Sequence, residues 1–297
     1  MKILITGGSG FIGSNFIKKF PEHQFIVLAR NIDRAKLTLS NKHRFYSNLN
    51  QISPDESIDA IINLAGEPIA NKRWSASQKN ILETSRCQIT QDLVSWIKRA
   101  HTKPLCFLSG SAIGIYGTSI DHAFTESDAA GEDFSSYLCH KWENTARSAD
   151  ESTRVVLLRT GIVLAANGGA LKKMSLPFKL GLGGVIGSGQ QWMSWIHVDD
   201  YLNAIEMLLK DESCHGPYNL TAPEPARNSV FVKALANSLH RPALLPMPAF
   251  VMKLALGEAA TLVLDGQKVL PQKLLENGFS FRFNNISAAL NNVFEAT

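Results

Sequence analysis

Apolar residues follow two alternating patterns along this chain. Short continuous apolar runs, typical of buried β-strands, are separated by stretches in which apolar residues recur every three or four positions, as on one face of a helix. This alternation predicts an α/β fold with a doubly wound parallel sheet and right-handed crossovers. The predicted strands are Lys2–Ile5, Gln24–Ala29, His43–Tyr46, Ile58–Gly66, Pro104–Ser109 and Arg154–Arg159, and the predicted helices span residues 15–20, Ser75 to about Ala100, and Phe134 to about Ala149.

The pattern changes after Arg159. Glycines at 168–169 and 181–184 bracket a basic, apolar segment, and prolines punctuate the helices predicted beyond residue 220. We therefore predict a sheet domain over residues 1–165, completed by later segments near 190–220. Residues 166–297 should form a smaller, discontinuous α/β lobe. Because ligands of open α/β sheets bind at the carboxyl ends of the strands, the lobe is expected to cap that edge.

A glycine-rich turn directly follows the first predicted strand. Gly7, Gly10 and Gly13 form a G-x-x-G-x-x-G pattern that opens the first helix. In a dinucleotide-binding turn such glycines allow a tight bend, a close approach to a pyrophosphate and close helix packing. The free N–H groups of the first helical turn, which includes Phe11 and Ile12, then face the anion. The alternative is an ordinary glycine turn. The position between two strands favours a Rossmann-type dinucleotide site.

The second predicted strand ends at a cation. NAD-selective sites usually carry Asp or Glu about 20 residues after the glycines, to bind the ribose 2′-hydroxyl. This chain has Arg30 there, and a guanidinium pairs well with the 2′-phosphate of NADP. A surface arginine at a strand end is also commonplace, and Asp33 is a nearby rival. The sequence favours NADP as the cofactor.

Arg86 interrupts the apolar stripe of the long predicted helix that begins near Ser75. A guanidinium on a buried face requires an anionic partner. That partner is either a carboxylate of the chain or a phosphate of the cofactor, and the spacing alone does not decide between them.

Tyr137 and Lys141 lie four residues apart in a predicted helix and therefore share one face. A neighbouring ammonium favours the phenolate of a tyrosine, so Tyr137 could take a proton from a substrate hydroxyl. Ser111, just after the preceding strand, would polarise the reacting oxygen. The alternative is a solvated lysine beside a packed tyrosine, because such pairs occur by chance in many helices. The sequence predicts a Ser-Tyr-Lys site made of Ser111, Tyr137 and Lys141.

Composition narrows the possible functions. The net charge is +4 without a basic run, and no apolar stretch approaches the roughly 20 residues that span a bilayer, so neither nucleic acid nor a membrane is an expected partner. The four cysteines are widely spaced, which is typical of buried thiols in a reducing cytoplasm rather than of a metal site. We expect a cytoplasmic protein with a small-molecule substrate, as a monomer or homodimer, and no metal.

Motifs along essentially the whole chain carry a family resemblance. They are Thr6–Gly13, Asn63–Gly66, Ser109–Gly117, Tyr137 with Lys141, Arg159–Leu164, Pro177–Gly184, Trp195–Asp200, Gly257 with Glu258, and Gly266–Val269. With these motifs the chain resembles the extended (atypical) short-chain dehydrogenase/reductase family. More narrowly it is similar to a sugar-epimerase-like branch of poorly characterised NADP-binding proteins.

The resemblance implies a set of site residues and an activity. The implied cofactor contacts are Gly7, Gly10, Phe11, Ile12, Gly13, Arg30, Leu64, Ala65, Gly66, Arg86, Ser109, Tyr137, Lys141 and Arg159. The implied function is an NADP(H)-dependent oxidoreductase or epimerase acting on a hydroxyl or carbonyl of a sugar nucleotide or another small molecule. A competing hypothesis is an NADP-binding sensor or regulator that does not turn over a substrate.

Overall fold

A parallel sheet of seven strands forms the centre of the computed structural model, which describes residues 1–295. Its strand order is β11-β7-β5-β4-β1-β2-β3, and every neighbouring pair is parallel. The inner strands are almost entirely buried, as continuous apolar runs covered on both faces should be. The strand bounds are β1 Lys2–Thr6, β2 Gln24–Leu28, β3 Arg44–Tyr46, β4 Ala60–Asn63, β5 Cys106–Ala112, β7 Arg154–Thr160 and β11 Gly216–Leu220.

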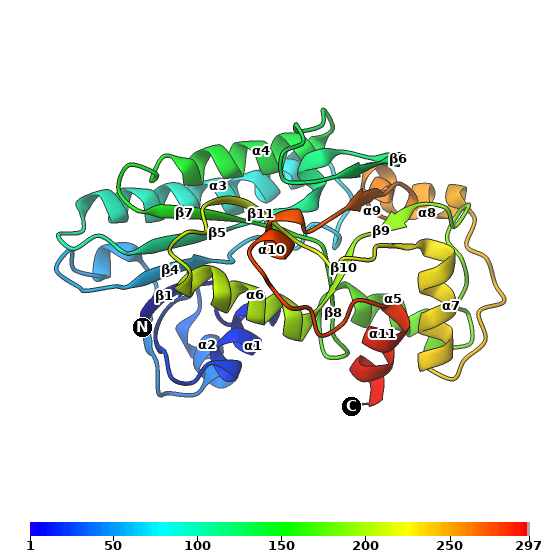
Figure 1. The fold of residues 1–297 in the computed structure, drawn as a ribbon, viewed down its shortest axis with the longest axis horizontal. Helices are drawn as coiled ribbons and strands as arrows, with labels where there is room; N and C mark the ends of the chain where they lie inside the picture. The colour runs from blue at the N-terminus through cyan, green and yellow to red at the C-terminus, as the bar shows by residue number, and fades with distance from the viewer. Residues whose placement is uncertain (296–297) are drawn as a thin grey trace.

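Helices cover both faces of this sheet (Figure 1). The apolar side chains of α1, α2 and α6 pack in one core cluster, and those of α3 and the end of α4 pack in a second cluster on the other face. The fold is thus the predicted Rossmann-type, doubly wound α/β arrangement. The bounds are α1 Phe11–Lys19, α2 Ile32–Leu39, α3 Ala76–Arg99, α4 Phe134–Arg147 and α6 Val198–Lys210.

The lobe has its own apolar core, in which Trp195, Phe231 and Leu290 are fully buried. Two two-stranded pairs connect it to the rest of the molecule, β8 with β10 and β6 with β13, and a third, β9 with β12, lies within the lobe. The strand bounds are β6 Ser119–Phe124, β8 Ile162–Leu164, β9 Trp192–Met193, β10 Trp195–His197, β12 Ala226–Arg227 and β13 Gln267–Val269. The helices are α5 Gly169–Lys179, α7 Asn228–Ser238, α8 Ala249–Leu256, α9 Thr261–Leu264, α10 Gln272–Glu276 and α11 Ile286–Glu295, and the short 3₁₀ helices are η1 Leu49–Gln51, η2 Ile113–Tyr116 and η3 Gly257–Ala260.

The sequence predicted that later segments near residues 190–220 complete the sheet. Only β11 joins the central sheet, as its edge strand beside β7. The segments β9 and β10 pair instead with β12 and β8. The division of the chain at residue 165 stays a prediction. None of the helices in residues 1–295 is both long enough and apolar enough to cross a membrane.

Candidate functional site

The glycine turn between β1 and α1 has room for backbone only. Gly7 has a φ of +67°, and a Cβ there would lie 2.6 Å from the carbonyl carbon of Leu64. A Cβ on Gly13 would lie 2.5 Å from the carbonyl oxygen of Gly7. Larger residues at either position would therefore push the turn away from its neighbours. The first helix packs closely against the strand edge, as the pattern predicted.

The N-terminus of α1 is free of side-chain caps. Its N-cap residue is Gly10, whose own N–H donates to the carbonyl oxygen of Gly7 at 2.9 Å. The first N–H to continue the helical ladder is that of Ser14, which donates to the Gly10 carbonyl. The N–H groups of Phe11, Ile12 and Gly13 thus lie in the uncapped first turn, where an anion is stabilised.

A buried polar chain fixes the segment opposite this turn. The Thr6 hydroxyl donates to Asn63 Oδ1 at 2.6 Å, and Asn63 Nδ2 donates to the Thr90 hydroxyl at 2.8 Å. The backbone N–H of Ala65 donates to the Thr6 hydroxyl. These bonds join β1, the end of β4 and α3. They hold Leu64 and Ala65 against the glycine turn.

Arg86 lies next to the same segment and has no carboxylate partner among the described residues. Its guanidinium donates to the backbone carbonyl oxygens of Leu82 and Glu67, at 3.0 and 2.9 Å. The guanidinium carbon also lies over the Trp142 ring, 5.4 Å from the ring centre. A Cβ on Gly66 would lie only 3.2 Å from the same carbon, so a larger residue at position 66 would crowd the guanidinium. Burial lowers the pKa of Arg86, so an added anion would stabilise its charge.

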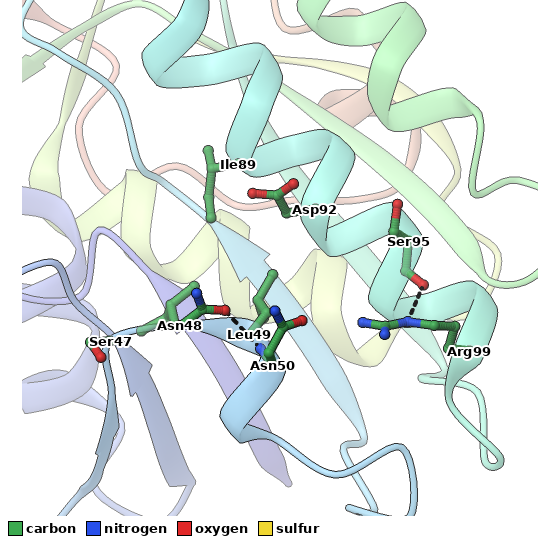
Figure 2. A pocket seen from close by; sticks show the side chains of 9 residues that line it. Ser47, Asn48, Leu49, Asn50, Ile89, Asp92, Ser95 and Arg99 are labelled. Carbon is green, nitrogen blue, oxygen red and sulfur yellow. Dashed lines mark hydrogen bonds between the residues drawn. The ribbon is translucent and has the colours of Figure 1, made fainter.

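A cavity of about 320 Å³ lies between the carboxyl ends of β2 and β3 and helix α3 (Figure 2). The cavity is lined by Leu28, two residues before Arg30, and by residues 47–50, which directly follow β3; Ile89, Asp92, Ser95 and Arg99 line it from α3. Arg30 itself is exposed, and Asn31 beside it caps α2 by accepting from the N–H of Arg34. The cavity and the cation therefore lie at the same carboxyl edge as the glycine turn.

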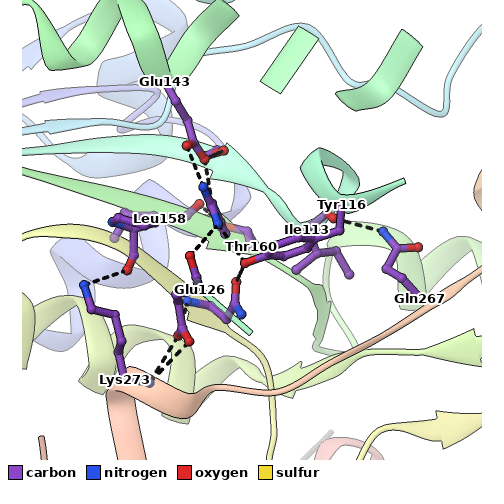
Figure 3. A network of polar contacts seen from close by, with 12 residues as sticks. Ile113, Tyr116, Glu126, Glu143, Leu158, Thr160, Gln267 and Lys273 are labelled. Carbon is purple, nitrogen blue, oxygen red and sulfur yellow. Dashed lines mark hydrogen bonds and ion pairs between the residues drawn. The ribbon is translucent and has the colours of Figure 1, made fainter. Parts of the chain in front are cut away.

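Ser111 and Arg159 meet in a buried network (Figure 3). The Ser111 hydroxyl donates to Glu143 Oε1 at 2.7 Å. Arg159 donates to both carboxylate oxygens of Glu143, at 2.9 and 3.0 Å, and to the Tyr116 oxygen at 2.8 Å. The neighbouring carboxylate holds the pKa of Arg159 above its usual value, despite burial. Because the guanidinium has these protein partners, contact between Arg159 and a cofactor stays a prediction.

A second carboxyl group extends this network towards the C-terminal part of the chain. The Glu126 carboxylate accepts the backbone N–H of Asn219 at 2.9 Å and lies 3.3 Å from the backbone nitrogen of Lys273. Burial raises the pKa of Glu126. The Tyr116 hydroxyl donates to Asn219 Oδ1, which links the two carboxyl groups through η2 and β11.

The predicted Ser-Tyr-Lys arrangement is not formed by Ser111, Tyr137 and Lys141 in this structure. Cys139 lies on the buried side of α4, and Tyr137 and Lys141, two positions away on either side, are rotated from it by about 200°. Tyr137 is accordingly 53% exposed, and Lys141 Nζ pairs with Glu83 of α3 at 2.5 Å. That hydrogen bond raises the pKa of Lys141. Tyr137 and Lys141 thus have the spacing of a Tyr-x-x-x-Lys pair, but they lie on a different side of α4 from Cys139 and from Glu143, which binds Ser111.

Ser109 lies two residues before Ser111 in β5. It is fully buried, and its hydroxyl has no hydrogen-bond partner within residues 1–295. The sequence motifs indicated neither the Thr6–Asn63–Thr90 chain nor the cavity residues after β3. The position of residues 47–50 directly behind a predicted strand was the one signal that pointed to the cavity.

These features define a Rossmann-type α/β protein with an anion-binding glycine turn at the carboxyl edge of its sheet. A family model described as "NAD dependent epimerase/dehydratase family" matches residues 3–221, and one described as "Domain of unknown function (DUF1731)" matches residues 247–293. The chain belongs to the NAD-dependent epimerase/dehydratase family, which confirms its resemblance to the extended short-chain dehydrogenases/reductases.

Individual relatives match along the full chain. "Epimerase family protein SH2119" of Staphylococcus haemolyticus is 39% identical and covers 99% of both chains. "Epimerase family protein SDR39U1 homolog, chloroplastic" of Arabidopsis thaliana is 38% identical over 99% of this chain and 87% of its own. The crystal structure of human epimerase family protein SDR39U1 (isoform2) with NADPH is similar at a TM-score of 0.92, with 34% identity and full coverage of both chains.

Proposed function

We propose that this protein is an NADP(H)-dependent oxidoreductase or epimerase that acts on a hydroxyl or carbonyl group of a small molecule. Membership of the epimerase/dehydratase family and the NADPH in the human relative's structure support this. Bound nicotinamide would supply hydride transfer. The chain's own contribution is to bind the dinucleotide and to orient a substrate over it.

The observation that carries the proposal is Arg86. A guanidinium that is half-buried, hydrogen-bonded within residues 1–295 only to backbone carbonyls, and adjacent to Gly66 is a ready partner for a phosphate. The uncapped N-terminus of α1 lies across Leu64 and Ala65 from it. We propose that the N–H groups of Phe11, Ile12 and Gly13 bind one side of the pyrophosphate and Arg86 the other.

The NADP preference rests on Arg30. Its exposed guanidinium is available for the 2′-phosphate, and the cavity beside Leu28 is large enough for the adenine end of the dinucleotide. The cavity wall after β3 offers the amide of Asn48 and the apolar side chain of Leu49. This placement orients the cofactor along the carboxyl edge of the sheet, from Arg30 past the glycine turn towards Ser111.

Ser111 supports an action on an oxygen-bearing carbon. Because its proton is donated to Glu143, the Ser111 oxygen keeps lone pairs that can accept a hydrogen bond from a substrate hydroxyl. Epimerisation would require oxidation of that carbon, rotation of the bound ketone and re-reduction without cofactor release.

One observation favours a second candidate function. Tyr137 is exposed and Lys141 pairs with Glu83, and neither has a hydrogen bond to Ser111 within residues 1–295, which supports a site without the usual proton-transfer pair of a short-chain reductase. A sensor or regulator that binds NADP(H) without turnover is compatible with that geometry.

The test is a fluorescence titration with NADPH and with NADH. We expect NADPH to bind at least tenfold more tightly than NADH, a difference of about 1.4 kcal/mol. Arg30→Ala should abolish the preference by weakening NADPH alone, and Arg86→Ala should weaken both nucleotides. Tyr137→Phe and the exposed control Arg147→Ala should bind NADPH like the native protein. Equal affinity for both nucleotides in the native protein would refute the role of Arg30.

Turnover then separates the two functions. Net NADPH oxidation with a carbonyl compound indicates a reductase, and interconversion of stereoisomers without net oxidation indicates an epimerase. Tight NADPH binding with neither activity across sugar nucleotides and simple carbonyl compounds would favour the sensor.

A further inference from the structure

Large apolar side chains are exposed together in one region of the lobe. Helix α8 has no buried residue at all, and its Phe250 and Leu254 are 69% and 73% exposed. Single exposed apolar residues are ordinary, but a contiguous group marks a binding surface. The group consists of Leu176, Leu180 and Leu182 from the end of α5 and the following turn, Leu244 and Leu245 from the loop before α8, and Phe250 and Leu254 from α8.

Backbone hydrogen bonds join these segments into one surface. The N–H of Leu245 donates to the carbonyl of Gly183 at 3.2 Å, and the N–H of Met247 donates to that of Val185 at 2.8 Å. The N–H of Gly187 donates to the carbonyl of Met247 at 2.9 Å. The residues after α5 and before α8 thus run side by side. We refer to residues 176–182 together with 244–254 as the lobe surface.

The lobe surface borders the proposed cofactor site. Lys173 of α5 hydrogen-bonds Asn71, and Arg73 donates to the backbone carbonyls of Leu254 and Ala255 at the end of α8. Residues 71 and 73 belong to the loop that continues from Leu64–Gly66, the segment packed on the glycine turn. At the other end, the start of α5 packs against Phe11 of that turn. The segments that carry the lobe surface are therefore tied directly to the loop and the turn that form the proposed cofactor site.

The two segments that form this surface are basic, and the acidic residue directly after them, Glu258, is paired with Lys79 at 2.7 Å. Residues 169–187 and 241–257 contain five basic residues, Lys172, Lys173, Lys179, Arg241 and Lys253, and no acidic residue. All five are exposed. An apolar surface with a cationic rim is complementary to a molecule that has an apolar body and an anionic group.

We propose that the substrate is an amphipathic anion: an apolar chain or ring system that carries a carboxylate, sulfate or phosphate group as well as the reacting hydroxyl or carbonyl. This inference rests on the proposed NADP(H)-dependent function and names the substrate class for it. The sugar of a sugar nucleotide is polar and gives the exposed leucines and Phe250 nothing to bury against. A second copy of the chain is disfavoured, because an isologous contact through this surface brings like charges together.

The experiment uses two fluorescent probes with the same ring system on the NADP-saturated protein. The anion 1-anilinonaphthalene-8-sulfonate should bind, and N-phenyl-1-naphthylamine, which lacks the sulfonate, should bind at least fivefold more weakly. The double variant Phe250→Glu with Leu254→Glu should lose both probes. The double variant Lys179→Glu with Lys253→Glu should lose the anion and retain the neutral probe. Leu37→Glu and Leu105→Glu, exposed apolar positions outside the lobe surface, are the matched controls.

Competition identifies the occupant. Decanoate should displace the anionic probe and UDP-glucose should not; displacement by UDP-glucose alone would overturn the inference. Self-association in sedimentation velocity that the Phe250/Leu254 variant abolishes would assign the surface to a second copy. Flotation with vesicles of phosphatidylglycerol and phosphatidylcholine, lost in the same variant, would assign it to a membrane.

NADPH titration of each variant keeps the two proposals separate. Normal NADPH binding without probe binding refutes the substrate class alone. Probe binding without NADPH binding refutes the proposed function alone.

Discussion

His197 is a buried imidazole that helps to begin helix α6. It is 2% exposed, its Nδ1 accepts the backbone N–H of Asp199 at 3.1 Å, and its ring lies 4.0 Å from that of Phe283. This geometry needs the neutral imidazole, because a protonated Nδ1 has no lone pair for the cap. Burial, together with the nearby cations Lys19 and Arg282, lowers the pKa of His197 to about 4, against the opposing effect of Asp199.

The pKa shift of His197 predicts a loss of stability in mild acid. Between pH 6.5 and about 4 the unfolded chain takes up a proton on this imidazole and the folded chain does not, so the free energy of unfolding falls as the pH falls, by up to about 3 kcal/mol. Urea unfolding at several pH values measures this. His197→Asn keeps a capping oxygen without a titrating group and should flatten the pH dependence, while the exposed control His140→Asn should not. An unchanged slope in His197→Asn would show that other groups cause it.

Single residues were predictable from the sequence where the backbone conformation accepts only one residue type. Gly7 and Gly13 were identified because no other residue fits the turn, and the structure shows backbone atoms where their Cβ atoms would be. Tyr137 and Lys141 share a helix face as predicted. Spacing determines which residues share a face, but only packing determines which face meets the sheet, and here Cys139 and Glu143 occupy that face.

At the scale of elements, N-caps and apolar periodicity predicted the helices and strands of the first half of the chain close to their observed bounds. Ser75 caps α3 by accepting the N–H of Gln78, and the helix ends at Arg99, next to the predicted end at Ala100. The strands β9 and β10 were harder to predict. Strands of two or three residues pair where the chain around them brings them together, rather than according to their own β-propensity. Helix α8 contains no fully buried residue, although Leu256 packs against a small core cluster, so the contacts at its ends contribute to its stability.

Arg73 provides the contact at the C-terminal end of α8. It donates Nε to the Ala255 carbonyl at 3.0 Å and a second N–H to the Leu254 carbonyl, where the negative end of the helix favours a cation. Arg73→Ala should speed hydrogen exchange of the amides in α8 by about tenfold, the equivalent of about 1.4 kcal/mol, with little change in global stability. Arg44→Ala, which removes an exposed ion pair on β3, is the control. Unaltered exchange in α8 would mean that Arg73 does not stabilise the helix.

At the scale of the whole molecule, the network around Arg159 joins the two parts of the chain. Arg159 of β7, Glu143 of α4 and Ser111 of β5 belong to the sheet domain, and the Tyr116 hydroxyl continues the network to Asn219 of β11. Glu126 then connects β11 to the start of α10 at Lys273 (Figure 3). The family resemblance predicted that Arg159 contacts the cofactor, and that contact stays a prediction. The Arg159 hydrogen-bond partners Glu143, Glu126 and Tyr116 lie 16, 33 and 43 residues away in sequence, on separate elements, so the sequence alone did not reveal them.

Replacing Arg159 alone should lower the free energy of unfolding more than replacing Arg159 and Glu143 together. Arg159→Leu leaves the Glu143 carboxylate buried without its cation, and we expect the free energy of unfolding to fall by about 3–5 kcal/mol. In the double variant Arg159→Leu with Glu143→Leu the uncompensated charge is gone, so the loss should be smaller than in Arg159→Leu alone, although Ser111 then lacks its acceptor. Urea unfolding of both variants, with Glu143→Leu completing the cycle, measures the coupling. If the double variant were as unstable as the sum of the single variants, the coupling energy would be zero and the ion pair itself would contribute nothing to stability.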